Sequence, residues 1–156
     1  MKYLFVAILL SLLVSACSST RLSHAEKNKI IEDFVQSEGL ENRSSISSFS
    51  MRSWTALNEE YLVLHTSVRK PHLVKLFMRC QDLDFSHTLY IHSRIPNTLS
   101  TGFDGVTTPD GSNIKCQISQ IYPLSKEQYS ALLDTIRVEA EEKELKAVQE
   151  EAQAES

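Results

Sequence analysis

Glycine is scarce in this chain, with four residues among 156. Neither a P-loop nor a Gly-rich dinucleotide fingerprint is present, and no G-x-S-x-G elbow presents a serine nucleophile. The chain also has no excess of positive charge, since it contains 16 lysines and arginines and 20 aspartates and glutamates. We therefore expect no nucleic-acid partner and no cofactor, and we expect that the protein is not an enzyme.

The chain also lacks a long apolar run. Residues 4–14 are apolar except for Ser11, and Lys2 precedes them. A spanning helix needs about 20 apolar residues, so this stretch is too short to remain in a membrane. The positive start and short apolar core are typical of an export signal, and we assign residues 1–16 to a signal peptide.

The end of this signal carries a cysteine. The stretch "LVSAC", residues 13–17, resembles the lipobox of bacterial lipoproteins. The resemblance implies that Cys17 carries a lipid and becomes the first mature residue, with residues 17–22 as a tether. The residue after Cys17 is Ser18. An aspartate at this position would resemble the signal that retains lipoproteins in the inner membrane. The expected location is thus the periplasmic face of the outer membrane, and the alternative is a secreted protein with an incidental Cys17.

Lipidation of Cys17 would leave two cysteines, Cys80 and Cys116. Disulfides persist in oxidising compartments such as the periplasm, so we predict a bridge between them. If both lie on strands, Cys80 shares a face with Val74, Leu76 and Met78, and Cys116 shares one with Ile114 and Ile118. This parity would fail at a β-bulge.

The mature chain is long enough for one domain, which we place at residues 23–136. Two capping boxes mark helix starts, "SHAE" at 23–26 and "SKEQ" at 125–128. Gly39 is a plausible stop for the first helix. Residues 137–156 hold three basic and seven acidic side chains, and we expect an acidic helical or disordered tail there.

Between the helices, short runs rich in β-branched and aromatic residues indicate strands. Candidate strands cover residues 46–52, 61–66, 72–79, 88–92, 103–107 and 114–121. We therefore expect an α+β fold: an antiparallel sheet or small open barrel of about five or six strands, flanked by an N-terminal and a C-terminal helix, with one disulfide.

The segments "RSWTALNEEYLVL" (52–64), "RKPHLVKL" (69–76), "CQDL" (80–83), "FDGV" (103–106) and "CQISQIYPL" (116–124) form a series. This series resembles a family of small uncharacterised Gram-negative lipoproteins, a domain of unknown function. The resemblance implies a compact, disulfide-linked, membrane-tethered domain and supplies no catalytic residues. The acidic tail departs from the family pattern.

Four basic residues mark a candidate interaction patch on one hairpin: Arg69, Lys70, Lys75 and Arg79. Such a patch could meet lipid headgroups or an acidic partner, and the alternative is a solvated strand face. Residues with metal-ligand side chains are Asp82, Asp84, His87 and His92, but their spacing matches no zinc motif and we expect surface residues there. We also expect Arg52 to pair with Asp82 or Asp104, and Trp54 to pack in the core.

The sequence thus favours a lipid-anchored, non-catalytic accessory protein of the periplasm. Its membrane contact would be lipidated Cys17, and its partner an envelope protein or a lipid headgroup, met through the basic hairpin or the acidic helix. One alternative is a binder of a small apolar ligand in the sheet domain. A hydrolase is a third possibility, which requires a histidine beside a serine or aspartate in a cleft.

Overall fold

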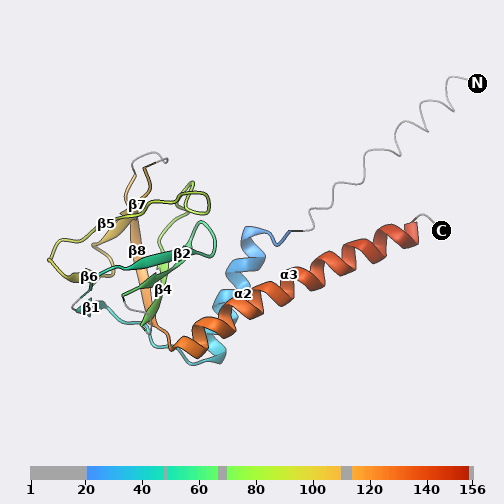
Figure 1. Cartoon of the computed structure of the whole chain (residues 1–156), viewed down its shortest axis with the longest axis horizontal. Coiled ribbons are helices and arrows are strands. Elements are labelled where there is room, and N and C mark those ends of the chain that lie inside the picture. The colour runs from blue at the N-terminus through green and yellow to red at the C-terminus, as the bar shows by residue number, and fades with distance from the viewer. Residues whose placement is uncertain (1–20, 48, 67–69, 110–113, 155–156) are drawn as a thin grey trace, which may run out of the picture. The chain divides into compact units, whose positions relative to one another are not determined.

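The fold is given by a computed structural model (Figure 1), which describes residues 21–47, 49–66, 70–109 and 114–154. The signal peptide, Cys17 and Arg69 lie outside the described residues. The chain forms two compact units, one of them Ser23–Ile136 and the other Met1–Leu22 with Arg137–Ser156. In chain order the elements are α2 (His24–Ser37), β1 (Ser45–Ser47), β2 (Ser53–Ala56), β3 (Tyr61–His65), β4 (Pro71–Leu76), β5 (Tyr90–His92), β6 (Thr98–Ser100), β7 (Gly105–Thr107), β8 (Cys116–Pro123) and α3 (Lys126–Ala154).

Six strands form one antiparallel sheet in the order β2-β3-β4-β8-β7-β5, curled into a half-barrel. Strands β1 and β6 pair as a separate two-stranded sheet. One helix precedes the sheet strands and one follows them, and a single disulfide is present among the described residues. The expected α+β fold is therefore confirmed.

The half-barrel is covered on both faces. In β3, Leu62 and Leu64 belong to the core inside the curl, whereas Tyr61 and Val63 belong to a second core that includes Ile31 of α2. Side chains alternate across a strand, so a sheet buried on both faces shows consecutive buried residues rather than alternation. The inner core also contains Phe49, Val74, Leu76, Leu83, Leu89, Leu99, Val106, Ile118 and Ile121. Side chains thus fill the inside of the curl.

Both helices begin where the capping boxes predict. Ser23 Oγ accepts from the Glu26 amide at 3.3 Å, and the Ser23 amide donates to Glu26 Oε2 at 2.7 Å. The Ser125 amide and Gln128 Oε1 make the equivalent bond at 2.9 Å. Helix α2 ends before Gly39, whose φ of +58° suits the left-handed C′ position. These local signals are confirmed because a capping box satisfies its own helix end without help from tertiary contacts.

Several strands differ from their expected bounds. The run predicted at 46–52 overlaps only the end of β1, at residues 46–47, and β2 begins beyond it at Ser53; between the two strands Phe49 is buried in the inner core. Strands β2 and β6 were not predicted. The strand expected at 103–107 shortens to β7, since Phe103 is exposed and Asp104 lies in a hydrogen-bonded turn with Ser100. Trp54 packs against the inner core, as predicted.

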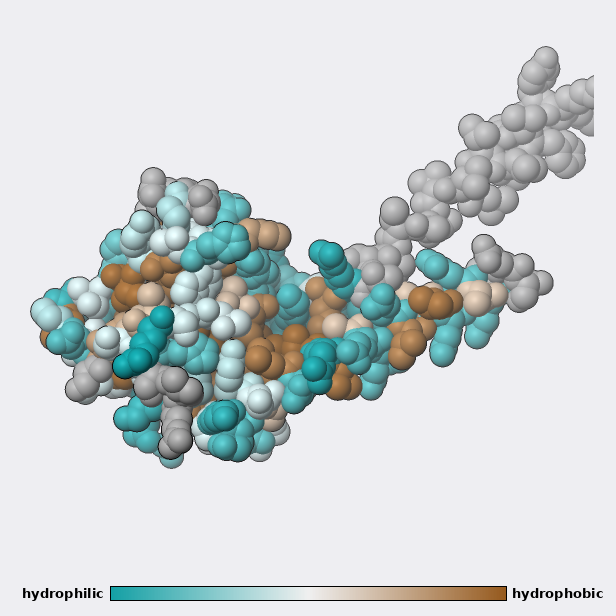
Figure 2. Space-filling view, viewed as in Figure 1, coloured by the Kyte–Doolittle hydropathy of each residue, from teal (hydrophilic) through white to brown (hydrophobic). Residues whose placement is uncertain are grey.

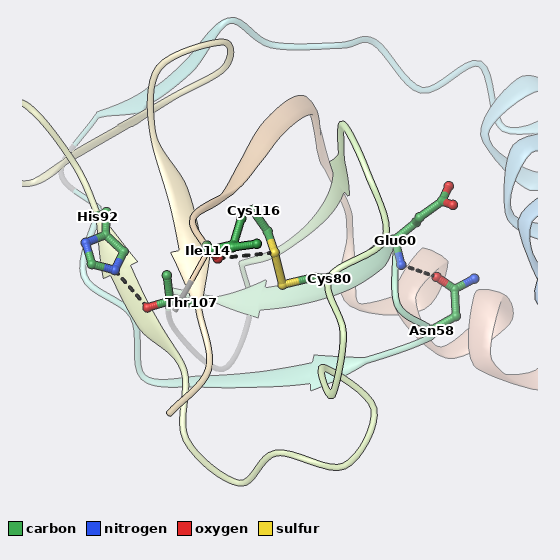
Figure 3. The surroundings of a disulfide bond; sticks show 7 residues. All are labelled: Asn58, Glu60, Cys80, His92, Thr107, Ile114 and Cys116. Atoms are coloured by element: carbon green, nitrogen blue, oxygen red, sulfur yellow. Dashed lines mark hydrogen bonds between the residues drawn. A yellow bond between two sulfur atoms is a disulfide. The ribbon is translucent and has the colours of Figure 1, made fainter. Parts of the chain in front are cut away.

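The Cys80–Cys116 disulfide is confirmed, with the two Cα atoms 5.7 Å apart (Figure 3). The parity argument for it is wrong in part, because Met78 and Ile114 are 53% and 60% exposed rather than buried beside the cysteines. Strand β4 ends at Leu76 after a register shift, and Cys80 lies in the turn beyond it. The bridge therefore joins a loop to the start of β8, and not two strand faces.

Gly105 allows β7 to approach the backbone of β8 closely at Cys116, the other end of the bridge. It pairs with Gln117 of β8, and a Cβ atom at this position would lie 2.6 Å from the carbonyl oxygen of Cys116. Any larger residue would push β7 away from β8. The glycine thus keeps the disulfide-bearing end of β8 tightly paired.

Candidate functional site

The four residues of the predicted basic patch do not form one positive surface among the described residues. Lys70 is exposed, and Arg69 lies outside the described residues. Lys75 points from β4 toward α2, where its Nζ lies 2.6 Å from Glu32 Oε1. Arg79 lies beyond β4, near Glu59 and Glu60. The charges of Lys75 and Arg79 are therefore matched within the fold by separate carboxylates.

Lys75 belongs to a three-residue cluster with Glu32 and Tyr61. The Tyr61 hydroxyl donates to Glu32 Oε1 at 3.1 Å, and Lys75 Nζ lies 5.3 Å from the centre of the Tyr61 ring. The hydrogen bond from Lys75 lowers the pKa of Glu32. Burial lowers the pKa of Lys75, but the hydrogen bonds to Glu32 and Tyr61 outweigh it and leave that pKa raised. Burial raises the pKa of Tyr61 to about 12.

A recess of about 240 Å³ opens beside this cluster, lined by Glu32, Val35, Gln36, Tyr61, Lys75, Gln120 and Tyr122. A general acid or base works best with a pKa near the working pH. Glu32 is shifted to stay ionised, and Tyr61 and Lys75 are shifted to stay protonated, so none suits proton transfer at neutral pH. The cluster holds α2 against β4, and its arrangement favours a structural role.

Arg79 lies beside the turn between β2 and β3. Asn58 Oδ1 accepts from the amides of Glu60 and Tyr61, each at 2.8 Å, which fixes the turn (Figure 3). Asn28 of α2 donates to Glu60 Oε2 at 2.9 Å. Arg79 Nε then lies 3.7 Å from Glu60 Oε1 and 3.9 Å from Glu59 Oε2. Both distances are too long for hydrogen bonds, so these are loose ion pairs.

A larger recess, of about 430 Å³, lies beside the disulfide and is lined by Glu59, Met78, Arg79, Gln81, Ile114 and Cys116. Figure 3 shows Ile114 next to the bridge. Cys116 Sγ lies 3.7 Å from the Ile114 carbonyl oxygen, which is a packing contact because a disulfide sulfur carries no proton. Of these residues, the sequence singled out Arg79 and Cys116, and Met78 and Ile114 only as buried strand residues.

The remaining candidate residues stay apart or are used structurally. His92 Nε2 lies 2.8 Å from Thr107 Oγ1 of the neighbouring strand (Figure 3), and Asp82 adopts a φ of +63° in a turn. Burial raises the pKa of Asp84. Within the described ranges, no group of three histidine, cysteine, aspartate or glutamate side chains could hold a metal ion.

The predicted pairing of Arg52 with Asp104 is wrong. Asp104 is 2% exposed, and its carboxylate accepts from the amides of Ser100 at 2.7 Å and Arg94 at 3.0 Å. The Arg52 side chain is exposed. A buried carboxylate needs hydrogen bonds, and here main-chain amides supply them in place of a guanidinium.

The second unit contains the end of α3, from Arg137, which we call the acidic extension. Three of its apolar side chains are 46–62% exposed: Val138, Leu145 and Val148. Figure 2 shows apolar residues among hydrophilic ones along this segment. Lys143 Nζ donates to the Arg21 carbonyl oxygen at 3.0 Å, and Lys146 Nζ lies 3.8 Å from Glu142 Oε2. No helix in the described part of the chain is apolar and long enough to span a bilayer.

Comparison with known proteins places this architecture in a family. The profile of DUF6491, a family of unknown function, matches residues 1–154. The chain belongs to this family. The match spans nearly the whole sequence, so the acidic extension is part of what DUF6491 covers. No curated protein and no solved structure matches the chain.

Proposed function

We propose that this DUF6491 protein is a lipid-anchored, non-catalytic accessory protein on the periplasmic face of the outer membrane, which binds a basic protein partner through its acidic extension. The observation that carries the proposal is the exposed face of α3. At about 100° per residue, Val138, Leu145 and Val148 fall within about 80° of one another around the helix. Exposed apolar side chains that gather on one face are typical of interaction surfaces.

The charges around this strip favour a basic partner. By the same helical spacing, Glu141 lies within the strip and Glu142 and Glu144 lie on its two sides. The Glu141 and Glu142 side chains are 66% and 55% exposed, and their ion pairs with Arg137 and Lys146, at 4.0 and 3.8 Å, are longer than hydrogen bonds. Like charges would face each other if two copies paired along this strip, which disfavours a homodimer. A basic surface with apolar side chains would match both features.

A crosslinking experiment in cells tests this site. A photocrosslinking amino acid is placed at Leu145, on the strip, and as a matched control at Glu150, on the opposite side of the same helix. We expect one stoichiometric protein adduct from Leu145 alone. Reversing Glu141, Glu142 and Glu144 to lysine should abolish it. Equal adducts from Glu150, an adduct with a second copy, or no adduct would contradict the proposal.

The lipid anchor is tested separately. Cys17→Ala should release the protein into the soluble periplasmic fraction, because each buried lipid methylene contributes about 0.8 kcal/mol to membrane binding. Ser18→Ala is the control and should leave the protein with the outer membrane on a density gradient. Sedimentation of Cys17→Ala with the outer membrane would refute the anchor while leaving the partner site intact.

A further inference from the structure

The recess beside the disulfide combines apolar walls with a cationic rim. Met78 and Ile114 form its walls and are each more than half exposed. They come from segments 36 positions apart, which the Cys80–Cys116 bridge holds together. The volume of about 430 Å³ falls within the range of about 300–1,000 Å³ for small-molecule sites.

The cationic rim is the guanidinium of Arg79, whose side chain is 58% exposed. A guanidinium has five donors in a planar fork that matches a carboxylate. Its distances of 3.7 and 3.9 Å to Glu60 and Glu59 exceed hydrogen-bond length. Arg79 could therefore turn its fork toward a ligand without breaking a hydrogen bond to either carboxylate.

The two carboxylates are less available to a ligand. Glu59 and Glu60 side chains are 32% and 23% exposed, and each lies 3.9 Å from a ring nitrogen of His24. Glu60 also accepts from Asn28. His24 and Asn28 of α2 thus contact these carboxylates together with Arg79. The group best placed to meet a ligand is the cation.

We propose that this recess binds a small amphipathic anion, a fatty carboxylate in chemical class. Its apolar chain lies against Met78, Ile114 and the disulfide, and its carboxylate meets the Arg79 fork. Charge decides between the ligand classes, since Arg79, at 58% exposed, is more accessible than Glu59, at 32%, the other charged side chain of the lining, and the walls are apolar. The proposal goes beyond the partner site on the acidic extension and does not depend on it.

Photolabelling of the full-length protein in membranes tests the proposal. The probe is dodecanoate that carries a diazirine near its methyl end, and labelled peptides are mapped by mass spectrometry. We expect label on the segment 78–81 or at Ile114, competed by unlabelled dodecanoate and not by dodecanol. Arg79→Gln should reduce labelling about tenfold, the loss expected for one charge-assisted contact.

Two further variants complete the test. Arg43→Gln is the matched control, because Arg43 is an exposed arginine 3.2 Å from Glu41, outside the residues that line the recess. It should label like the unaltered protein. Ile114→Ser should also reduce labelling, because it removes part of the apolar wall while it leaves Arg79 unchanged. The proposal is overturned by label spread along the chain, by undiminished labelling of Arg79→Gln, or by stronger competition from dodecylammonium than from dodecanoate.

Discussion

Glu32 and Lys75 are 43 positions apart in the sequence, yet Glu32 Oε1 of α2 and Lys75 Nζ of β4 lie 2.6 Å apart. The same oxygen accepts from Tyr61 of β3. One carboxylate thus connects the N-terminal helix to two central strands. Charge-assisted hydrogen bonds of this kind are stronger than neutral ones.

Glu32→Gln should lower the free energy of unfolding by about 1 kcal/mol, since the pair is partly exposed and solvent screens it. Asp33→Asn is the matched control on the same helix, where an exposed pair with Lys29 should contribute less than about 0.5 kcal/mol. Urea denaturation at neutral pH measures both. Because the pKa of Glu32 is lowered from 4.5, its contribution is present above that pH and disappears as the pH falls. Equal losses in the two variants would contradict this role.

Asp104→Ala should destabilise the protein by about 2–3 kcal/mol, because it leaves the Ser100 and Arg94 amides without their acceptor. Asp104→Asn retains one acceptor oxygen and should lose less. Thermal unfolding followed by circular dichroism distinguishes the two. If the asparagine variant were the less stable one, the carboxylate would act in some way other than by accepting these bonds.

Replacing both Cys80 and Cys116 with serine should lower the melting temperature by about 10 °C or more. The bridge closes a loop of 36 positions, for which the loss of chain entropy in the unfolded state corresponds to about 4 kcal/mol. Scanning calorimetry should show the same shift when the unaltered protein is reduced. A reduced protein that melts at the oxidised temperature would argue against this stabilisation.

His72 should make stability fall as the pH drops from about 7.5 to about 5.5. Its side chain is 8% exposed, and burial lowers its pKa below 6.5, opposed in part by hydrogen bonds with the backbone of Lys70 and Leu64. Below its ordinary pKa the unfolded chain binds a proton that the folded chain does not, so acid favours unfolding.

His72→Phe should therefore flatten the pH dependence of the free energy of unfolding, measured by urea titration at each pH. Burial also lowers the pKa of His65, so part of the slope should remain and should disappear in the double variant His65→Phe/His72→Phe. Lys70 and His65 are the charged neighbours that disfavour protonation of His72. An unchanged slope in His72→Phe would contradict the assignment.

Local patterns predicted the helices well and the edges of the sheet poorly. The capping boxes at Ser23 and Ser125 identify helix starts because all their partners lie within three residues. Strand β6 has three residues and pairs with a strand of three, so alternation has too little length to be visible. The pair of cysteines was predicted from compartment and count, whereas the position of Cys80 depends on a register shift that sequence does not reveal.

The candidate recess could not be predicted, since three separate segments assemble it. Glu59 comes from a turn, Met78 and Arg79 from the loop after β4, and Ile114 from the approach to β8. Ile114 and Met78 carry the pattern of buried strand residues. They lie outside the strands because β4 ends at Leu76 and β8 begins at Cys116, and both ends depend on long-range pairing.

The hydrogen bond from Lys143 to the Arg21 carbonyl limits the distance between the acidic extension and Cys17. Arg21 is four positions from Cys17, and four extended steps of the chain span at most about 14 Å. With a lipid on Cys17, the middle of the acidic extension would stay within that distance of the bilayer surface, plus the length of one lysine side chain. A partner of this helix would then be sought among proteins that reach the bilayer surface.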